Sequence, residues 1–236
     1  MTHRLAAWIG AIVTTGLCLT PAPGLAQGPA SAPTRAAQVA ADLPAPPAPD
    51  PADAEYQALL ARLKQADRSV DFLHLRRAFA DSSAYRPYAD SREEAMLDAI
   101  DANEPARALE IARTILDGNY LNIEAHFAGT VACSALKDAA CASQHQFVAQ
   151  GMLNSIAASG DGRSPESAFA VVNTPEEYAI ARVMGTRVLG QAATRTPDGH
   201  AYDVLTIEDR RTGEERRIYF NVDRAMAAMA KLLARQ

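Results

Sequence analysis

Two cysteines near the middle of the chain, Cys133 and Cys141, have a spacing that favours a disulfide bond. The residues between them include a predicted turn between two helices around Lys137 and Asp138. Residues on opposite sides of such a turn can come within the roughly 4.4–6.8 Å between Cα atoms that a disulfide requires. We therefore predict a structural disulfide here. Two buried free thiols and a redox-active pair are the alternatives, although the Cys-x-x-Cys pattern of redox centres is absent.

A second group of candidate residues is polar and lies in predicted loops of the second half of the chain. Its members are Asp161, Glu166, His200 and Asn221. Carboxylate, imidazole and amide groups act together only when they converge within hydrogen-bond reach of one ligand. We expect this convergence at the junction between a helical part and a sheet. There the four side chains would form a small-ligand-binding or hydrolytic site.

The glycine-rich run Ser159–Gly162 has a structural explanation that competes with a binding role. Successive glycines expose backbone N–H groups that can hold an anion, and Asp161 adds oxygens suited to a cation. The spacing is not that of a calcium loop, so we favour a turn that ends one helix. Similarly, Thr174 and Glu177 form a predicted capping box, which assigns Glu177 a structural rather than a catalytic role.

Motifs of established catalytic centres are absent from the sequence. No two of His126, His145 and His200 have metal-ligand spacing, and no His-Glu-x-x-His occurs. The stretch from Ser134 to Lys137 matches the Ser-x-x-Lys of penicillin-interacting enzymes, but the companion motifs are missing. We predict no metal, no cofactor and no catalytic residue, and we favour a protein that is not an enzyme.

The first 26 residues predict export. A basic start with Arg4 leads into an apolar run, Leu5–Leu19, that is too short for a bilayer needing about 20 residues. Small residues precede a predicted signal-peptidase cut after Ala26. We expect a periplasmic or secreted protein without an integral membrane segment after cleavage.

Composition divides the rest of the chain into a linker and one folded domain. Residues 27–53 are rich in Ala and Pro, which predicts a solvated, disordered linker. Residues 54–236 are long enough for a single domain, with a helical part at 54–158 and a mixed part at 159–236. The formal net charge of −5 and the absence of a basic stripe argue against nucleic acid as a partner.

The helical part is predicted to consist of paired helices. Helical spacing and helix-start residues place four helices at about 91–102, 105–117, 122–137 and 138–158. Pro105 suits a first helical turn, and Asn122 and Asp138 can cap the two helices that follow. Ala108 and Ala142 are 34 residues apart, which is the tetratricopeptide period. A tetratricopeptide-like arrangement and an ordinary helical bundle are both compatible with this pattern.

The mixed part changes to the period of β-strands. Alternating apolar and β-branched residues predict strands at 187–194, 200–208 and 215–222, joined by two turn sequences. We expect a three-stranded antiparallel sheet. A helix at 223–234, with Met226 and Met229 on one side, should cover one face of it. The fold class is therefore α+β.

Several short motifs carry a resemblance to a known family. In the second half they are Ser155-Ile156, Ser159–Glu166, Ala168-Phe169, Glu176-Glu177-Tyr178, Tyr202–Leu205 and Tyr219–Asp223. In the first half they are Asp71-Phe72, Leu75-Arg76, Tyr85, Pro87-Tyr88, Asn119-Tyr120 and Ala125-His126. Together these motifs resemble the bacterial family called domain of unknown function 4919, over nearly all of residues 55–233. The resemblance implies an exported protein with a helical front and a small sheet, and it brings no established activity.

These observations favour a non-enzymatic binding or protein-interaction module in the cell envelope. Its partner would be another envelope protein or a peptide, recognised by the helical hairpins or the sheet. The alternative is a small-ligand-binding or hydrolytic protein that uses the four polar residues at the junction.

Overall fold

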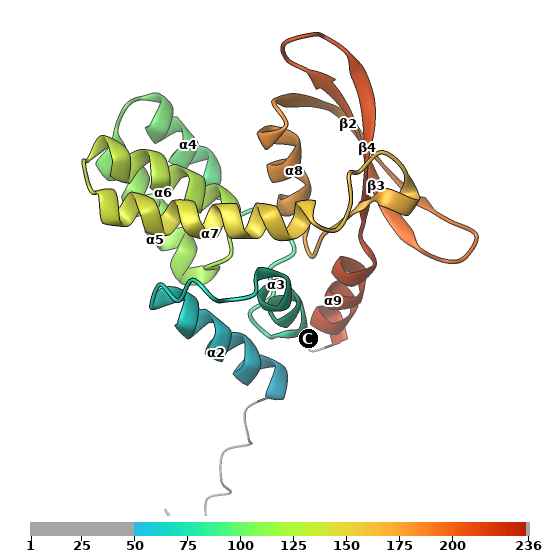
Figure 1. The fold of residues 1–236 in the computed structure, drawn as a ribbon, viewed down its shortest axis with the longest axis horizontal. Coiled ribbons are helices and arrows are strands. Elements are labelled where there is room, and N and C mark those ends of the chain that lie inside the picture. The colour runs from blue at the N-terminus through green and yellow to red at the C-terminus, as the bar shows by residue number, and fades with distance from the viewer. Residues whose placement is uncertain (1–49, 235–236) are drawn as a thin grey trace, which may run out of the picture. The chain divides into compact units, whose positions relative to one another are not determined.

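A computed structural model describes residues 50–234, which fold into eight α-helices and a four-stranded mixed sheet (Figure 1). The helical elements are α2 (Pro51–Lys64), α3 (Phe72–Asp81), α4 (Glu93–Asp101), α5 (Pro105–Gly118), α6 (Ile123–Ala135), α7 (Ala139–Ala157), the 3-10 helix η1 (Pro165–Ser167), α8 (Thr174–Val183) and α9 (Asp223–Ala234). The strands are β1 (Phe169–Ala170), β2 (Thr186–Arg195), β3 (Ala201–Asp209) and β4 (Glu215–Asn221). The predicted signal peptide and the predicted linker up to residue 49 lie outside the described residues.

Local side chains start several helices where the sequence predicts. The Asn122 side chain accepts a hydrogen bond from the Ala125 N–H at 2.8 Å, and Asp138 accepts one from the Cys141 N–H at 3.0 Å. Pro105 occupies the first turn of α5. These caps satisfy N–H groups that a helix leaves without partners, so the predicted starts of α5, α6 and α7 are confirmed. The helix predicted from about residue 91 begins at Glu93 instead, and no side chain caps it.

The predicted capping box at the start of α8 is wrong by one residue. Asn173, not Thr174, caps the helix by accepting a hydrogen bond from the Glu176 N–H at 3.1 Å. Glu176, at the third position of the helix, does not complete a capping box with Asn173, because its Oε2 accepts a hydrogen bond from the N–H of the preceding residue, Val172, at 2.9 Å. Glu177 therefore has no part in the cap, and its burial needs a different explanation.

The sheet has four strands in the order β1-β4-β3-β2, which corrects the predicted three-stranded sheet. The predicted antiparallel meander is present as β2, β3 and β4. The additional strand, β1, runs parallel to β4 with Phe169 opposite Phe220. It contains only two residues, so no alternation of side chains could show it in the sequence.

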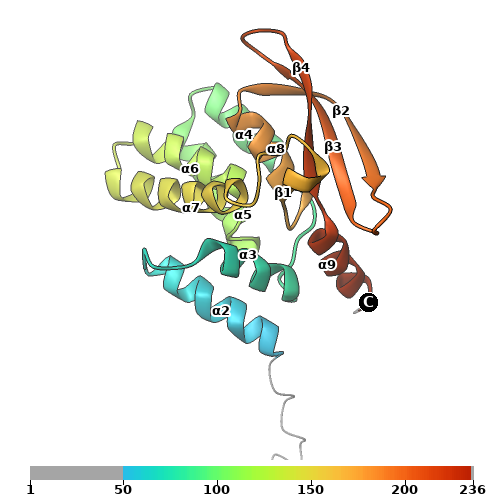
Figure 2. The ribbon, with the colours of Figure 1, turned by 45° about the vertical axis from the view of Figure 1, so that its right-hand side comes forward.

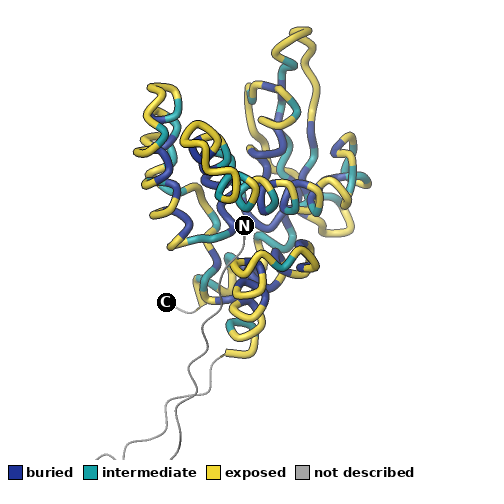
Figure 3. The backbone as a smooth tube through the Cα atoms, turned by 60° about the vertical axis from the view of Figure 1, so that its left-hand side comes forward, coloured by how far each residue is buried: buried dark blue, intermediate teal, exposed yellow. Residues whose placement is uncertain are grey.

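The hydrophobic core of the described residues consists of one large cluster, which helices and the sheet share, and two smaller clusters among α4, α5 and α6. Its largest cluster includes Leu63 of α2, Phe79 of α3, Ile156 of α7, Leu205 of β3 and Phe220 of β4. Among the described elements, α3 contacts α7 and α9, and α8 contacts both α6 and β2 (Figure 2). The ends of the β2–β3 and β3–β4 hairpins are exposed (Figure 3). No helix in residues 50–234 is long and apolar enough to cross a membrane.

A buried ion pair joins the helical part to the mixed part. The Arg76 guanidinium of α3 contacts both carboxylate oxygens of Glu176 in α8, at 2.8 and 2.6 Å, and each side chain is only 2% exposed. Arg76 also donates hydrogen bonds to the Ser155 hydroxyl at 3.2 Å and to the Ala170 carbonyl at 2.9 Å. A buried charge is tolerated when it is paired and hydrogen-bonded in this way.

Removing one partner of this pair is expected to destabilise the protein strongly. Glu176→Gln leaves the Arg76 charge buried without a counter-charge, which typically costs about 3–5 kcal/mol. Urea unfolding monitored by circular dichroism measures this loss. The matched control is Arg107→Ala, which removes an exposed ion pair with Glu104 and should cost no more than about 1 kcal/mol. If Glu176→Gln and Arg107→Ala lowered the free energy of unfolding equally, the Arg76–Glu176 pair would not stabilise the protein as described.

Candidate functional site

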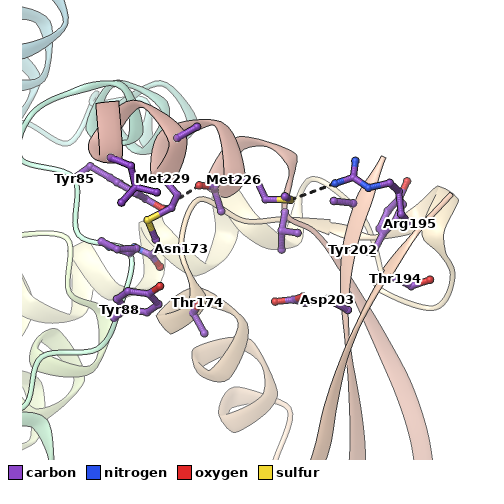
Figure 4. A pocket seen from close by; sticks show the side chains of 17 residues that line it. Tyr85, Tyr88, Asn173, Thr174, Thr194, Arg195, Tyr202, Asp203, Met226 and Met229 are labelled. Carbon is purple, nitrogen blue, oxygen red and sulfur yellow. Dashed lines mark hydrogen bonds between the residues drawn. The ribbon is translucent and has the colours of Figure 1, made fainter. Parts of the chain in front are cut away.

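A pocket of about 660 Å³ lies where the helical part, the sheet and α9 meet (Figure 4). It is lined from four places in the chain: the segment after α3, the start of α8, the β2–β3 hairpin and α9. The lining residues are Tyr85, Pro87, Tyr88, Asn173, Thr174, Ala193, Thr194, Arg195, Ala201, Tyr202, Asp203, Val222, Ala225, Met226, Met229, Ala230 and Leu233. Most of these side chains are apolar or aromatic, which is the usual composition of a ligand pocket.

Backbone contacts fix one aromatic wall of the pocket. The Tyr85 hydroxyl donates a hydrogen bond to the Val172 carbonyl at 2.8 Å, and burial raises the pKa of Tyr85 above its ordinary value. Tyr88 follows three residues later and is 68% exposed, an unusual position for a large aromatic side chain. The buried tyrosine therefore anchors the segment, and Tyr88 is left available at the surface.

The apolar side of α9 lines the pocket and does not cover the sheet as predicted. Met226 is 48% exposed and Leu233 is 62% exposed, whereas Ala228 is the buried residue of this helix. The helix instead packs against α3. Arg224 and Lys231 of α9 each hold the Asp81 carboxylate of α3, at 2.8 and 2.6 Å. These contacts turn the methionine side of α9 toward solvent.

A pair of carboxyl groups lies at the sheet side of the pocket. Burial, together with the charge of Asp203, raises the pKa of Glu177 to about 9. Glu177 Oε2 is buried and has no hydrogen-bond donor within the described residues. Protonation of Glu177 explains why a buried oxygen can lack a donor, because the Glu177 O–H can itself donate a hydrogen bond to Asp203. Asp203 lines the pocket. With its pKa raised this far, Glu177 keeps its proton at neutral pH.

Asp203 is held in place from the other side by two polar groups. Its Oδ2 accepts a hydrogen bond from the Gln191 side-chain amide at 2.9 Å. The Tyr178 hydroxyl in turn donates to the Gln191 carbonyl oxygen at 2.9 Å. Because Gln191, Tyr178 and Asp203 come from β2, α8 and β3, these bonds also fix α8 on the sheet.

Two of the four predicted site residues come together through a third residue. His200 Nδ1 lies 2.6 Å from the Asp223 carboxylate, and the Asn221 amide donates to the same carboxylate at 3.2 Å. Asp223 also accepts a hydrogen bond from the Ala201 N–H at 2.8 Å. These bonds join the start of α9 to β3, at the edge of the pocket, and they raise the pKa of His200 above its ordinary value.

The other two predicted site residues lie in the turn after α7. Asp161 accepts hydrogen bonds from the Ser167 hydroxyl at 2.6 Å and the Arg163 N–H at 3.0 Å, and Glu166 is exposed. No hydrogen bond or ion pair in residues 50–234 joins either of them to His200 or Asn221. The four residues therefore form two separate groups, and a binding role for them stays a prediction.

The predicted disulfide between Cys133 and Cys141 is confirmed, with 5.7 Å between the Cα atoms. A ring nitrogen of His145 and the two sulfur atoms lie within 4.8 Å of one another. His145 also contacts His126, with 3.0 Å between their Nδ1 atoms. The sequence spacing of the histidines did not indicate this contact. The hairpin gave only a partial signal, because residues equally far from its turn face each other and this rule places His145 opposite Gly129, about one helical turn from His126.

The fold and the pocket define an α+β protein with a mostly apolar pocket at the junction of its helices and sheet. The chain belongs to the family described as Domain of unknown function (DUF4919), which it matches over residues 50–231. No curated protein and no solved structure matches the chain. The resemblance seen in the sequence is thereby confirmed.

Substituting Glu177 should change how stability depends on pH. The folded protein keeps the Glu177 proton up to about pH 9, whereas the unfolded chain releases it near the ordinary pKa of 4.5. Raising the pH through this window therefore favours unfolding. Glu177→Gln removes the effect, so its stability relative to wild type should rise with pH by up to about 1.4 kcal/mol per unit.

Urea unfolding at pH 5, 7 and 9 checks this expectation. Glu110→Gln is the matched control, because Glu110 lies on the exposed side of α5. Parallel pH profiles for wild type and Glu177→Gln would show that Glu177 does not retain its proton in the folded protein.

Proposed function

We propose that this protein is an exported, non-enzymatic binding module that takes an extended apolar segment of another envelope protein in its junction pocket. The observation that carries this proposal is the exposed apolar lining, in which Tyr88, Met226 and Leu233 are all exposed. Exposed apolar groups gathered around a hollow are typical of an interaction site. Tyrosine and methionine are also enriched at the centre of protein interfaces.

The edge of the sheet beside the pocket favours an extended partner. Strand β2 is the last strand in the order of the described sheet, so its outer edge has no neighbouring strand. Its residues 190–195 are exposed, and Ala193, Thr194 and Arg195 also line the pocket. An extended peptide can pair with such an edge while one of its side chains enters an adjacent pocket.

Export is consistent with the cysteine chemistry. The signal-peptide pattern of residues 1–26, with its predicted cut after Ala26, supports a periplasmic or secreted location. Disulfides such as Cys133–Cys141 form and persist in oxidising compartments.

A second candidate function is hydrolysis or binding of a small polar ligand at the same junction. The observation that favours it is the Glu177–Asp203 pair, in which burial keeps one carboxyl group protonated at neutral pH. An acid and a carboxylate side by side can donate and accept protons. Of the predicted polar residues, His200 and Asn221 would be the ones near such a site.

Site-specific photo-crosslinking in cells that make the full chain tests the proposal. A photoreactive amino acid replaces Tyr88 in one strain and, as a matched control, Val131 in another. Val131 is 52% exposed but lies on α6, away from the pocket. We expect one envelope protein to be captured at Tyr88 and not at Val131. The captured segment is then identified and synthesised as a peptide.

Binding of that peptide to the purified protein decides between the candidates. The peptide should bind one to one, and Met229→Asp should weaken binding at least about tenfold, as expected for a buried apolar anchor. Val131→Asp should leave the affinity unchanged. Equal crosslinking at Tyr88 and Val131 would contradict the proposal. So would a peptide that binds the Met229→Asp variant with the same affinity as wild type. An effect of Glu177→Gln on turnover of a small substrate would favour the hydrolytic alternative.

A further inference from the structure

We propose that the α6–α7 hairpin holds a Zn²⁺ site that opens when its disulfide is reduced, with Cys133, Cys141 and His145 as the metal ligands. The site is separate from the junction pocket, and the proposal does not depend on the proposed function. It rests on the positions of three side chains that bind zinc well: two sulfur atoms and one ring nitrogen within 4.8 Å of one another.

The backbone of the hairpin can accommodate the metal without rearrangement. Two thiolates bound to a tetrahedral zinc, each at about 2.3 Å, stand about 3.8 Å apart. The Cα atoms of Cys133 and Cys141 are 5.7 Å apart, so rotation of the side chains provides this separation. The hairpin does not depend on the disulfide alone, because Cys133 is also packed in a cluster with Ala108 and Leu109.

A chain of hydrogen bonds prepares His145 as a ligand. His126 Nε2 lies 2.8 Å from the Tyr120 carbonyl, which can only accept, so this nitrogen carries the proton. In this tautomer His126 Nδ1 carries a lone pair, and it accepts a hydrogen bond from the Nδ1–H of His145, with 3.0 Å between the two nitrogens. His145 is left with an unprotonated Nε2. Zinc-bound histidines commonly donate their second N–H to a neighbour in this way.

The hairpin also leaves space for the His145 ring and a path for a metal ion from solvent. A Cβ atom at Gly129 would lie 2.7 Å from the His145 ring, so glycine at this position lets the ring lie against α6. Cys133 is buried, but Cys141 and His145 are partly exposed, which gives a metal ion a path from solvent. A water molecule can complete the tetrahedral set with the three protein ligands.

The redox step that opens the site is a dithiol exchange. A dithiol reductant gives two electrons and two protons to the Cys133–Cys141 disulfide and becomes a disulfide itself. The two thiols then release their protons to water as Zn²⁺ binds to the thiolates. A disulfide oxidant reverses the change by thiol–disulfide exchange: the two thiolates form the Cys133–Cys141 bond, the oxidant takes up two electrons and two protons to become a dithiol, and Zn²⁺ is released. The hairpin would therefore hold zinc only under reducing conditions.

Cobalt and zinc titrations of the purified full-length protein test this inference. The protein is reduced with a phosphine, freed of reductant without air, and titrated with Co²⁺ as a spectroscopic substitute for Zn²⁺. We expect one Co²⁺ per chain with a thiolate-to-cobalt charge-transfer band, displaced by Zn²⁺. The oxidised protein should show no such band. Zn²⁺ should also raise the unfolding temperature of the reduced protein only.

Three variants make the result specific. Cys133→Ser/Cys141→Ser should abolish the band, and circular dichroism checks that this variant is folded. His145→Ala should weaken Co²⁺ binding at least about tenfold, since it removes one of three protein ligands. His74→Ala is the matched control, because His74 lies on α3, contacts Glu55 and should have no effect. A reduced wild-type protein without the band, or an unchanged affinity in His145→Ala, would overturn the proposal.

Discussion

The buried contact between Arg76 and Glu176 is the constraint on which the rest of the structure depends. It connects α3 with α8, and its two side chains also bind the short segment between β1 and α8. Arg76 holds the Ala170 carbonyl, and Glu176 holds the Val172 N–H. Because charged groups this deep in a protein are stable only with complete pairing, the helical part and the sheet must keep one relative position.

The junction pocket follows from that constraint. The Val172 carbonyl, on the segment held by the ion pair, accepts the hydrogen bond of Tyr85 and so positions the aromatic wall. Asp81 of α3 holds α9 through two basic side chains, which turns Met226 and Met229 toward the hollow. The pocket is therefore built by contacts between distant parts of the chain. Its apolar lining is the physical basis of the proposed binding role, and Asp203, which is next to the buried Glu177, adds a carboxyl group to that lining.

Local patterns predicted local structure well. The caps at Asn122 and Asp138, the three antiparallel strands and the Cys133–Cys141 bond all depend on neighbouring residues or on one turn. Strand β1 was missed because two residues show no period. The cap of α8 was placed one residue too late, because Asn173 and Thr174 are both suitable cap residues and the Asn173 side chain is the one that accepts the Glu176 N–H. The pocket was missed because its walls come from four separate segments. The exposed methionines of α9 resembled a core-facing stripe, since periodicity identifies an apolar side but not what covers it.

Amide hydrogen exchange of wild type and Glu176→Gln tests most directly whether this ion pair couples the two parts. The account predicts faster exchange in α3, in β1 and in the first turn of α8 together, because all three lose their shared partner. The α5 helix, whose buried residues all lie in the two smaller clusters, should keep its protection. Faster exchange confined to the first turn of α8 would contradict the account. A uniform increase over the whole chain would contradict it equally.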